Sequence, residues 1–109
     1  MTKPVGAVLV VEIDVEPEFD DEFNRWYDEE HIPERTDMPG FVSAQRFRHP
    51  DRANSYLAIY ELESADAATS DWYMSREQTE WAKQIMPHWT SMTRTVWPAI
   101  TAKTSLTDA

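Results

Sequence analysis

Residues 41–63 read FVSAQRFRHPDRANSYLAIYELE and predict the β-hairpin on which the fold is built. Two runs of strand-forming residues, 41–49 and 55–63, flank a polar loop that opens with a proline, which is typical of antiparallel strands. Alternation along the first run predicts that Phe41 and Arg46 point to opposite faces of the sheet. Large apolar side chains occur on both faces of the hairpin, so we expect both faces to be covered.

Two further strands and a helix are predicted outside the hairpin. The apolar run VGAVLVVEI at 5–13 predicts a strand that is buried on both faces, and SMTRTVWPAI at 91–100 predicts another. A helix is expected from Pro17, which suits a first turn, to a point near His31. It should end there because Pro33 disfavours helical backbone in the residue before it.

A second helical region is predicted between the hairpin and the last strand. It starts at Ser64 or Asp66, both of which are favourable helix caps. The capping-box pattern of Ser75 and Gln78 predicts a break and a restart. Pro87 should end this region before the last strand begins.

The element order β-α-β-β-α-β predicts an α+β, ferredoxin-like fold, in which a four-stranded antiparallel sheet carries both helices on one face. The 109 residues, 1–109, are expected to form a single domain. Such a sheet leaves its other face bare, although the strands are apolar on both sides. A second copy of the same sheet is the simplest cover, so we predict a homodimer with the two sheets packed face to face into an α+β barrel.

The charge of the chain excludes several classes of partner. The net charge is −10, and the whole imbalance lies between Glu12 and Asp37, where there are twelve acids and two bases. This charge disfavours binding to nucleic acid and to an anionic membrane surface. The absence of cysteine excludes disulfides, thiolate metal sites and a cysteine nucleophile. With no long apolar stretch and no signal-peptide pattern, we expect a cytoplasmic protein without membrane contact.

Cofactor motifs are also missing from the sequence. There is no GxGxxG, P-loop or GxSxG pattern, which disfavours nucleotide-dependent and serine-hydrolase chemistry. Glu30, His31 and Glu34 include metal-ligand types, but EF-hand and HExxH spacings are absent, and a solvated helix face is the better interpretation. We therefore expect neither a metal nor an organic cofactor.

The stretch 23–47, FNRWYDEEHIPERTDMPGFVSAQRF, resembles the EthD-like and related small proteins of the dimeric α+β barrel superfamily. The features that it shares with them are Trp26-Tyr27, His31, Pro33, Glu34-Arg35, Pro39-Gly40-Phe41 and Arg46. This resemblance implies a pocket between the helices and the sheet, near the end of the first helix. The superfamily includes cofactor-free monooxygenases, isomerases, cyclases, decarboxylases and haem proteins, so the resemblance implies no single activity.

His31 is the candidate general acid or base, because the pKa of histidine lies near neutrality. Asp28, three residues earlier, is a candidate to fix its tautomer, and Tyr27, Arg35 or Arg46 would stabilise a developing oxyanion. The alternative for His31 is a partly exposed histidine that is stabilised by the helix dipole. The alternative for both arginines is an ion pair with the acidic helix.

An aromatic wall is the expected binding surface for a flat hydrophobic ligand. Together with Arg46, its candidate substrate-binding residues are Trp26, Tyr73, Trp81, His88, Trp89 and Trp97. The alternative is that these rings fill the core or the dimer interface, although five tryptophans are many for a chain of this length.

The leading hypothesis is a small cofactor-independent enzyme that acts on a hydrophobic carbonyl, lactone or aromatic compound. Its acid–base chemistry would be of the isomerase, cyclase or decarboxylase type. One alternative is a ligand-binding or accessory protein of a catabolic or biosynthetic cluster, with the same pocket and no chemistry. Another is a cofactor-free monooxygenase, and haem binding is a weaker possibility.

Overall fold

A computed structural model describes residues 4–70 and 77–104 of the chain. Its four strands form one antiparallel sheet in the order β2-β3-β1-β4. The strands are β1 (Ala7–Val15), β2 (Phe41–Arg48), β3 (Ser55–Leu62) and β4 (Trp89–Pro98). This is the predicted β-α-β-β-α-β arrangement, and the ferredoxin-like α+β fold is confirmed.

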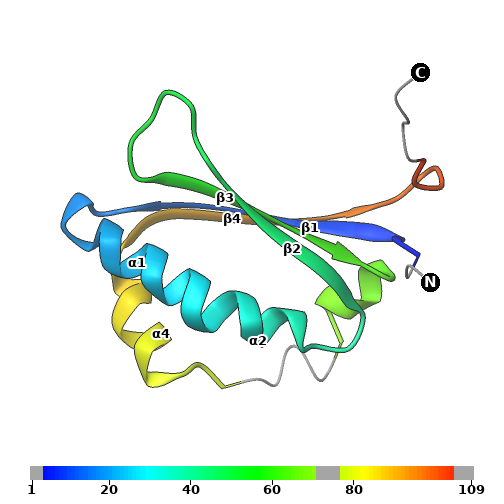
Figure 1. Cartoon of the computed structure of the whole chain (residues 1–109), viewed down its shortest axis with the longest axis horizontal. Coiled ribbons are helices and arrows are strands. Elements are labelled where there is room, and N and C mark those ends of the chain that lie inside the picture. The colour runs from blue at the N-terminus through cyan, green and yellow to red at the C-terminus, as the bar shows by residue number, and fades with distance from the viewer. Residues whose placement is uncertain (1–3, 71–76, 105–109) are drawn as a thin grey trace.

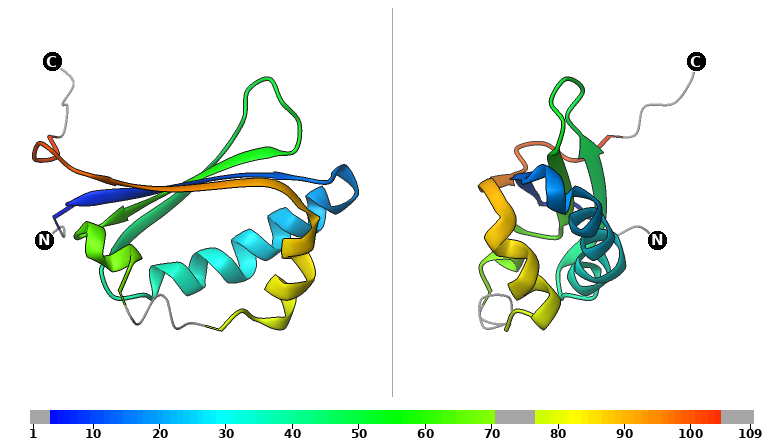
Figure 2. Two further views of the ribbon diagram at one scale, coloured as in Figure 1. Left: turned by 180° about the vertical axis from the view of Figure 1, so that it is seen from behind. Right: turned by 90° about the vertical axis from the view of Figure 1, so that its left-hand side faces the viewer.

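The helical segments lie on one face of the sheet, as Figures 1 and 2 show. The first helical region is a nearly continuous helix. It is made of η1 (Pro17–Phe19), α1 (Asp20–Trp26), η2 (Tyr27–His31) and α2 (Ile32–Thr36). The second region contributes η3 (Ala65–Ala68), α4 (Glu80–Ile85) and η4 (Met86–His88). Among the described segments, none is a helix long and apolar enough to cross a membrane.

Strand alternation separates the two faces of the sheet. In β1, Leu9 and Ile13 are almost fully buried beneath the helices, whereas Glu12 is exposed on the other face. On that other face, Trp97 of β4 is 58% exposed and Phe47 of β2 is 41% exposed. The core therefore lies between the sheet and the helices, and the outer face of the sheet keeps large exposed apolar side chains.

The first helix does not end near His31, and that prediction is wrong. It continues to Thr36 because η2 is a π-helical turn, in which the N–H of Ile32 bonds to the carbonyl of Tyr27 five residues earlier. Pro33, at the start of α2, has no N–H to donate, and its ring would crowd the carbonyl of an ordinary α-turn. The wider π-turn accommodates the proline within the helix.

A register shift in β2 changes the face of Phe41. The pairing with β3 is irregular between Phe41 and Ser43, as in a β-bulge. Phe41 is therefore buried and packs edge-on against Tyr60 with ring centroids 5.8 Å apart. Arg46 lies on the same helix-covered face, over the ring of Tyr27. The prediction that Phe41 and Arg46 point to opposite faces is wrong because the bulge inserts an extra residue.

The second helical region begins at Ser64, the N-cap of η3, as predicted, but it restarts at a different residue. The N-cap of α4 is Thr79, whose hydroxyl accepts a hydrogen bond from the N–H of Ala82 at 3.0 Å. Ser75, half of the predicted capping box, lies outside the described residues. The predicted end is confirmed, since Pro87 lies in the short η4 turn and β4 begins at Trp89.

Candidate active site

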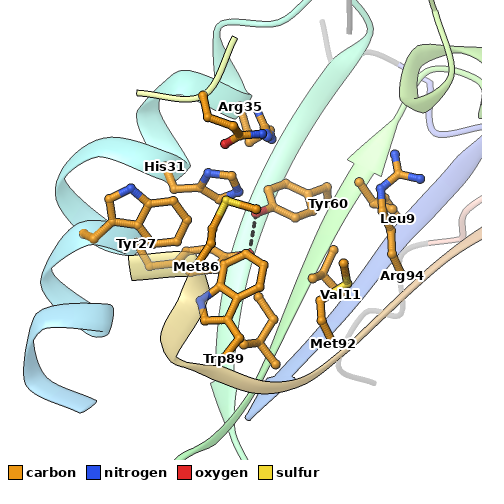
Figure 3. Close-up of a pocket in the computed structure, with 13 residues that line it drawn as sticks. Leu9, Val11, Tyr27, His31, Arg35, Tyr60, Met86, Trp89, Met92 and Arg94 are labelled. Carbon is orange, nitrogen blue, oxygen red and sulfur yellow. Dashed lines mark hydrogen bonds between the residues drawn. The ribbon is translucent and has the colours of Figure 1, made fainter. Parts of the chain in front are cut away.

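A cavity of about 140 Å³ lies between the helix layer and the sheet (Figure 3). Its polar lining residues in the described part of the chain are His31, Arg35, Gln78 and Arg94. Its apolar and aromatic lining residues are Leu9, Val11, Ile13, Trp26, Tyr27, Tyr60, Met86, Trp89 and Met92. The pocket that the family resemblance implied between helices and sheet is therefore present.

The sheet supplies one wall of the cavity through its alternation. Leu9 and Val11 of β1 point to the helix-covered face, and Arg94 of β4 pairs with Val11 in the neighbouring strand. Tyr60 of β3 pairs with Leu9 on the other side. Neighbouring positions of three adjacent strands therefore meet at one patch of the sheet. The opposite wall comes from the helix and from the start of β4, which contributes Trp89.

His31 lies in the π-turn and is enclosed by aromatic rings. Its ring stacks on Trp26 with centroids 4.6 Å apart and meets Tyr27 edge-on at 4.8 Å. Burial first, and the positive charges of Arg35 and Arg46 second, together lower the pKa of His31 to about 3. The imidazole is therefore neutral near pH 7 and lines the cavity.

Two buried phenols join the helix to the sheet next to His31. The hydroxyl groups of Tyr27 and Tyr60 are 2.7 Å apart and share a hydrogen bond in which either can be the donor. Arg46 lies above the ring of Tyr27, with its guanidinium carbon 4.5 Å from the centroid. The rings of the two tyrosines and the hydroxyl pair fix the floor of the cavity beside the imidazole.

Arg46 itself forms an ion pair with the acidic helix, which was the alternative expected for it. It donates to Asp28 at 2.8 Å and to the amide oxygen of Asn24 at 2.6 Å. Asp28 therefore faces Arg46, not His31, and its side chain is 65% exposed. The prediction that Asp28 orients the imidazole of His31 is therefore wrong. Arg46 lies behind Tyr27 and is not part of the cavity lining.

Arg35 and Arg94 are the two charged residues among the described cavity walls. Arg35 in α2 donates to the carboxylate of Glu34 at 3.3 Å and contacts the sulfur of Met38 at 3.8 Å. Arg94 in β4 donates to the carbonyl of Ala68 at 2.8 Å. One guanidinium comes from the helix layer and the other from the sheet, and Figure 3 shows Arg35 at the top of the view and Arg94 at the right.

The wall residue Trp26 is held by the half-buried carboxylate of Glu30. Its indole N–H donates to Glu30 at 2.8 Å, and the hydroxyl of Thr79 donates to the same oxygen at 2.6 Å. Because Thr79 is also the N-cap of α4, Glu30 joins the π-turn to the second helical region. This carboxylate therefore positions the cavity wall and does not enter the cavity lining.

The predicted aromatic wall is only partly correct. Trp26 and Trp89 line the cavity. Trp81 lies under the guanidinium of Arg25 at 5.8 Å and does not line it. Trp97 is exposed on the outer face of the sheet, because alternation in β4 points it away from the helices. Tyr73 lies outside the described residues.

His88 also lies away from the cavity. Its Nδ1 atom is 2.8 Å from the carboxylate of Glu16, and its ring stacks on Phe19 with centroids 3.4 Å apart. This cluster closes the far end of the helix layer, where η1 meets η4. His88 is therefore a structural contact between the two helical regions.

The lining residues that were not predicted from the sequence are Leu9, Val11, Ile13, Tyr60, Gln78, Met86, Met92 and Arg94. Tyr60 and Arg94 are the central residues of their strands on the inner face, so alternation anchored on the buried Leu9 of β1 could have found them. In the described parts of the chain, no group of three or more acidic or histidine side chains is arranged to hold a metal ion.

A family model described as "Domain of unknown function (DUF4286)" matches residues 7–96. The chain belongs to that family. The DUF4286 match extends from the first residue of β1 almost to the end of β4 and so includes the whole described cavity. No curated protein matches this sequence.

Solved structures show the same fold at low sequence identity. SnoaB, a cofactor-independent oxygenase from Streptomyces nogalater, is 19% identical with a TM-score of 0.65, over 87% of this chain and 93% of that one. The heme degrader MhuD from Mycobacterium tuberculosis is 15% identical with a TM-score of 0.63, over 87% and 96%. A dimeric ferredoxin-like protein from an uncultured marine organism is 11% identical with a TM-score of 0.75, over 97% of each chain.

These likenesses support the ferredoxin-like fold that the superfamily resemblance implied. At such identities they carry no residue roles to this DUF4286 chain. The EthD-like group within the superfamily stays a prediction, since the solved structures named above are described as an oxygenase, a heme degrader and a dimeric ferredoxin-like protein.

Proposed function

We propose that the protein is a small cofactor-independent enzyme that moves a proton next to the carbonyl group of a one-ring hydrophobic compound. His31 is the acid–base group. The observation that supports this most directly is a neutral imidazole held between aromatic rings in the wall of an apolar cavity. A cavity of about 140 Å³ is close to the roughly 150 Å³ that holds one benzene molecule.

The chemistry follows from the groups around the cavity. His31 accepts a proton from the carbon next to the carbonyl, and the electron pair of that C–H bond moves to the carbonyl oxygen to form an enolate. Arg35 and the Tyr27–Tyr60 hydroxyl pair lie beside the imidazole and favour negative charge on that oxygen. Where a carbon–carbon double bond is conjugated with the enolate, return of the proton to its far carbon moves the double bond and gives an isomer without net oxidation. Ring ketones and lactones belong to this substrate class.

A cofactor-free monooxygenase is the second candidate, and the likeness to SnoaB favours it. The same proton removal produces a carbanion that dioxygen can oxidise without a flavin or metal. The balanced reaction converts a CH2 group and O2 into a C=O group and water, and the substrate supplies the electrons. The two candidates therefore share the first step and differ in whether oxygen is consumed.

Haem does not fit the described cavity. MhuD is described with two hemes bound in its active site. A porphyrin contains four pyrrole rings, whereas the cavity here has room for about one ring. No step of the proposal passes through haem.

The test measures proton exchange and oxygen consumption together. Phenylacetone, a neutral one-ring ketone, is incubated with the protein in D2O, deuterium uptake next to its carbonyl is followed by NMR, and O2 uptake is recorded. We expect protein-dependent exchange that falls about a hundredfold or more in His31→Gln. His49→Gln, in the hairpin loop, is the matched control and should keep full exchange. Equal exchange in wild type and His31→Gln would contradict the proposal, and binding without exchange or O2 uptake would favour a ligand-binding protein.

The pH profile gives an independent check of the same role. For free enzyme and substrate, kcat/KM reports the pKa of the essential base. Because the pKa of His31 is about 3, kcat/KM should stay level from pH 8 to about pH 5. A fall of kcat/KM centred near pH 6.5, the ordinary pKa of histidine, would refute this assignment.

A homodimer is also part of the proposed functional form. The outer face of the sheet has no described helix over it (Figure 1). Trp97 and Phe47 are exposed on that face. Trp97 pairs with Val8, and Phe47 pairs with Leu57, which extends the apolar surface across the sheet. Packing of two such faces buries this surface, as in the predicted α+β barrel.

Sedimentation velocity tests this assembly. Wild type is expected to sediment as a dimer, and Trp97→Glu should shift the equilibrium toward monomer because it places a charge in the apolar contact. Thr101→Glu, just beyond β4, is the control for added charge. A wild-type protein that is monomeric at micromolar concentration would overturn the proposed dimer.

A further inference from the structure

The sign of charge inside the cavity is opposite to that of the chain as a whole. The chain has 20 acidic and 10 basic residues. Yet Arg35 and Arg94 are the charged residues among the described cavity walls, and no described aspartate or glutamate lines them. The chain as a whole is acidic, but the charged residues in the described cavity walls are positive. This distribution of charge favours binding of an anion in the cavity.

Two acids near the cavity, Asp28 and Glu30, are bonded to groups that are not its charged lining residues. Asp28 binds Arg46 on the far side of Tyr27. Glu30 accepts hydrogen bonds from the indole N–H of a wall tryptophan and from Thr79. Glu34 forms an ion pair with Arg35 at 3.3 Å and offsets part of its charge, although Glu34 is not part of the described lining.

The two guanidinium groups lie at one end of the cavity. Along β4, Arg94 pairs with Val11 and Met92 pairs with Ile13, so the apolar Met92 lies two residues nearer the start of the strand. Arg94 is anchored to the carbonyl of Ala68 in η3 at its own end. In Figure 3, Arg35 lies at the top of the view and Arg94 at the right, whereas Trp89 and Met92 lie at the bottom.

Resting on the proposed function, we propose that the substrate is a one-ring aromatic anion whose carboxylate lies between Arg35 and Arg94. Its ring packs at the end formed by Trp26 and Trp89, and His31 lies between the ring and the carboxylate end. Arg94 is then the residue that selects an anionic substrate over its neutral analogue. Arginine suits this role because its planar guanidinium matches the geometry of a carboxylate.

Such an anion also suits the proton transfer. The charges of Arg35 and Arg46 lower the pKa of His31 in the empty cavity. A carboxylate bound next to these guanidiniums opposes their effect on the imidazole and raises the pKa of His31. The bound substrate thereby makes His31 a better proton acceptor than it is in the free protein.

The test compares benzoate with benzamide, which has nearly the same shape and no charge at pH 7. Dissociation constants are measured by titration calorimetry at pH 7, where a carboxylic acid is ionised. We expect wild type to bind benzoate at least about tenfold more tightly than benzamide, as for a charge-assisted contact. Arg94→Gln should reduce that ratio to about one to three, and Arg94→Lys should retain part of it.

Two further variants keep the result interpretable. Arg52→Gln removes a surface arginine that pairs with Asp14, and it should leave the benzoate-to-benzamide ratio unchanged. Arg35→Gln should lower the ratio as Arg94→Gln does, which gives a second route if one variant does not fold. Equal affinity for benzoate and benzamide in wild type, or an unchanged ratio in Arg94→Gln and Arg35→Gln, would overturn the inference.

The binding test of the anion site and the exchange test of the proposed function can fail independently of each other. His31→Gln should keep the preference for benzoate, because the imidazole does not hold the carboxylate. A preserved preference with no exchange of phenylacetone or of phenylpyruvate, a one-ring ketone that carries a carboxylate, refutes the enzyme and leaves the anion site. Exchange that depends on His31, without any preference for benzoate, refutes the anion site and leaves the enzyme.

Discussion

The buried imidazole makes the stability of this protein depend on pH in a defined direction. His31 has a pKa of about 3 in the folded protein, because of burial first and the charges of Arg35 and Arg46 second. In the unfolded chain its pKa is about 6.5. Between these two values the unfolded chain binds a proton that the folded protein does not bind. The free energy of unfolding therefore falls as the pH falls from about 6.5 toward 3.

The size of this effect follows from the two pKa values. Integration of the proton difference from pH 6 to pH 4 gives a loss of about 2.5 kcal/mol from His31 alone. His31→Gln removes this titration and leaves the carboxylates of the chain unchanged. From pH 6 to pH 4, wild type should therefore lose about 2.5 kcal/mol more stability than His31→Gln loses.

Urea denaturation followed by tryptophan fluorescence measures the effect at both pH values and at one protein concentration. The quantity of interest is the change in unfolding free energy of wild type minus that of the variant, so contributions from shared groups cancel. In a second measurement, the NMR signal of the His31 ring should keep the chemical shift of the neutral form down to about pH 4.5. A difference between the two proteins below about 0.5 kcal/mol, or a ring that titrates near pH 6.5, would refute the reasoning.

Two other substitutions test contacts that position the site. Glu30→Ala leaves the indole N–H of Trp26 buried without its acceptor and should cost about 2 kcal/mol in urea unfolding, whereas Glu29→Ala, which loses an exposed pair, should cost no more than about 0.5 kcal/mol. Gly40→Ala should cost about 2 kcal/mol or more, because φ is +85° and the new Cβ would lie 2.7 Å from a neighbouring one. Asn54→Gly, also at positive φ, should change stability little, and equal losses at both positions would contradict the backbone argument.

The strands could be predicted from the sequence because alternation and apolar runs report burial directly. The predicted strands 5–13 and 91–100 are each displaced by two residues from β1 (Ala7–Val15) and β4 (Trp89–Pro98). The displacement is explained by pairing, since a strand extends as far as its neighbour supplies hydrogen-bond partners. Local sequence contains no direct signal of where that neighbour ends.

The candidate site could be predicted where it lies within one helical segment. Tyr27, His31 and Arg35 follow one another at intervals of four residues, and all three line the cavity. Asp28 was placed beside His31 by ordinary α-helical spacing, but the π-turn widens the helix there, so residues three apart no longer share a face. The contribution of Arg94 depends on the register of β4, which only the assembled sheet defines.

The overall charge of the chain could not have predicted the charge of its cavity. Composition gives only the number of acidic residues. The electrostatic field at a site also depends on which acids have partners and on which side of the helix they lie. Asp28 is neutralised by Arg46, and Glu30 accepts two hydrogen bonds, so neither cancels the charge of Arg35 in the cavity. Exposed acids on the solvent side are screened within about 8 Å at physiological salt, whereas groups inside the cavity are screened much less. The acidic helix therefore presents negative charge to water and carries a guanidinium on its cavity side, where an anion would bind.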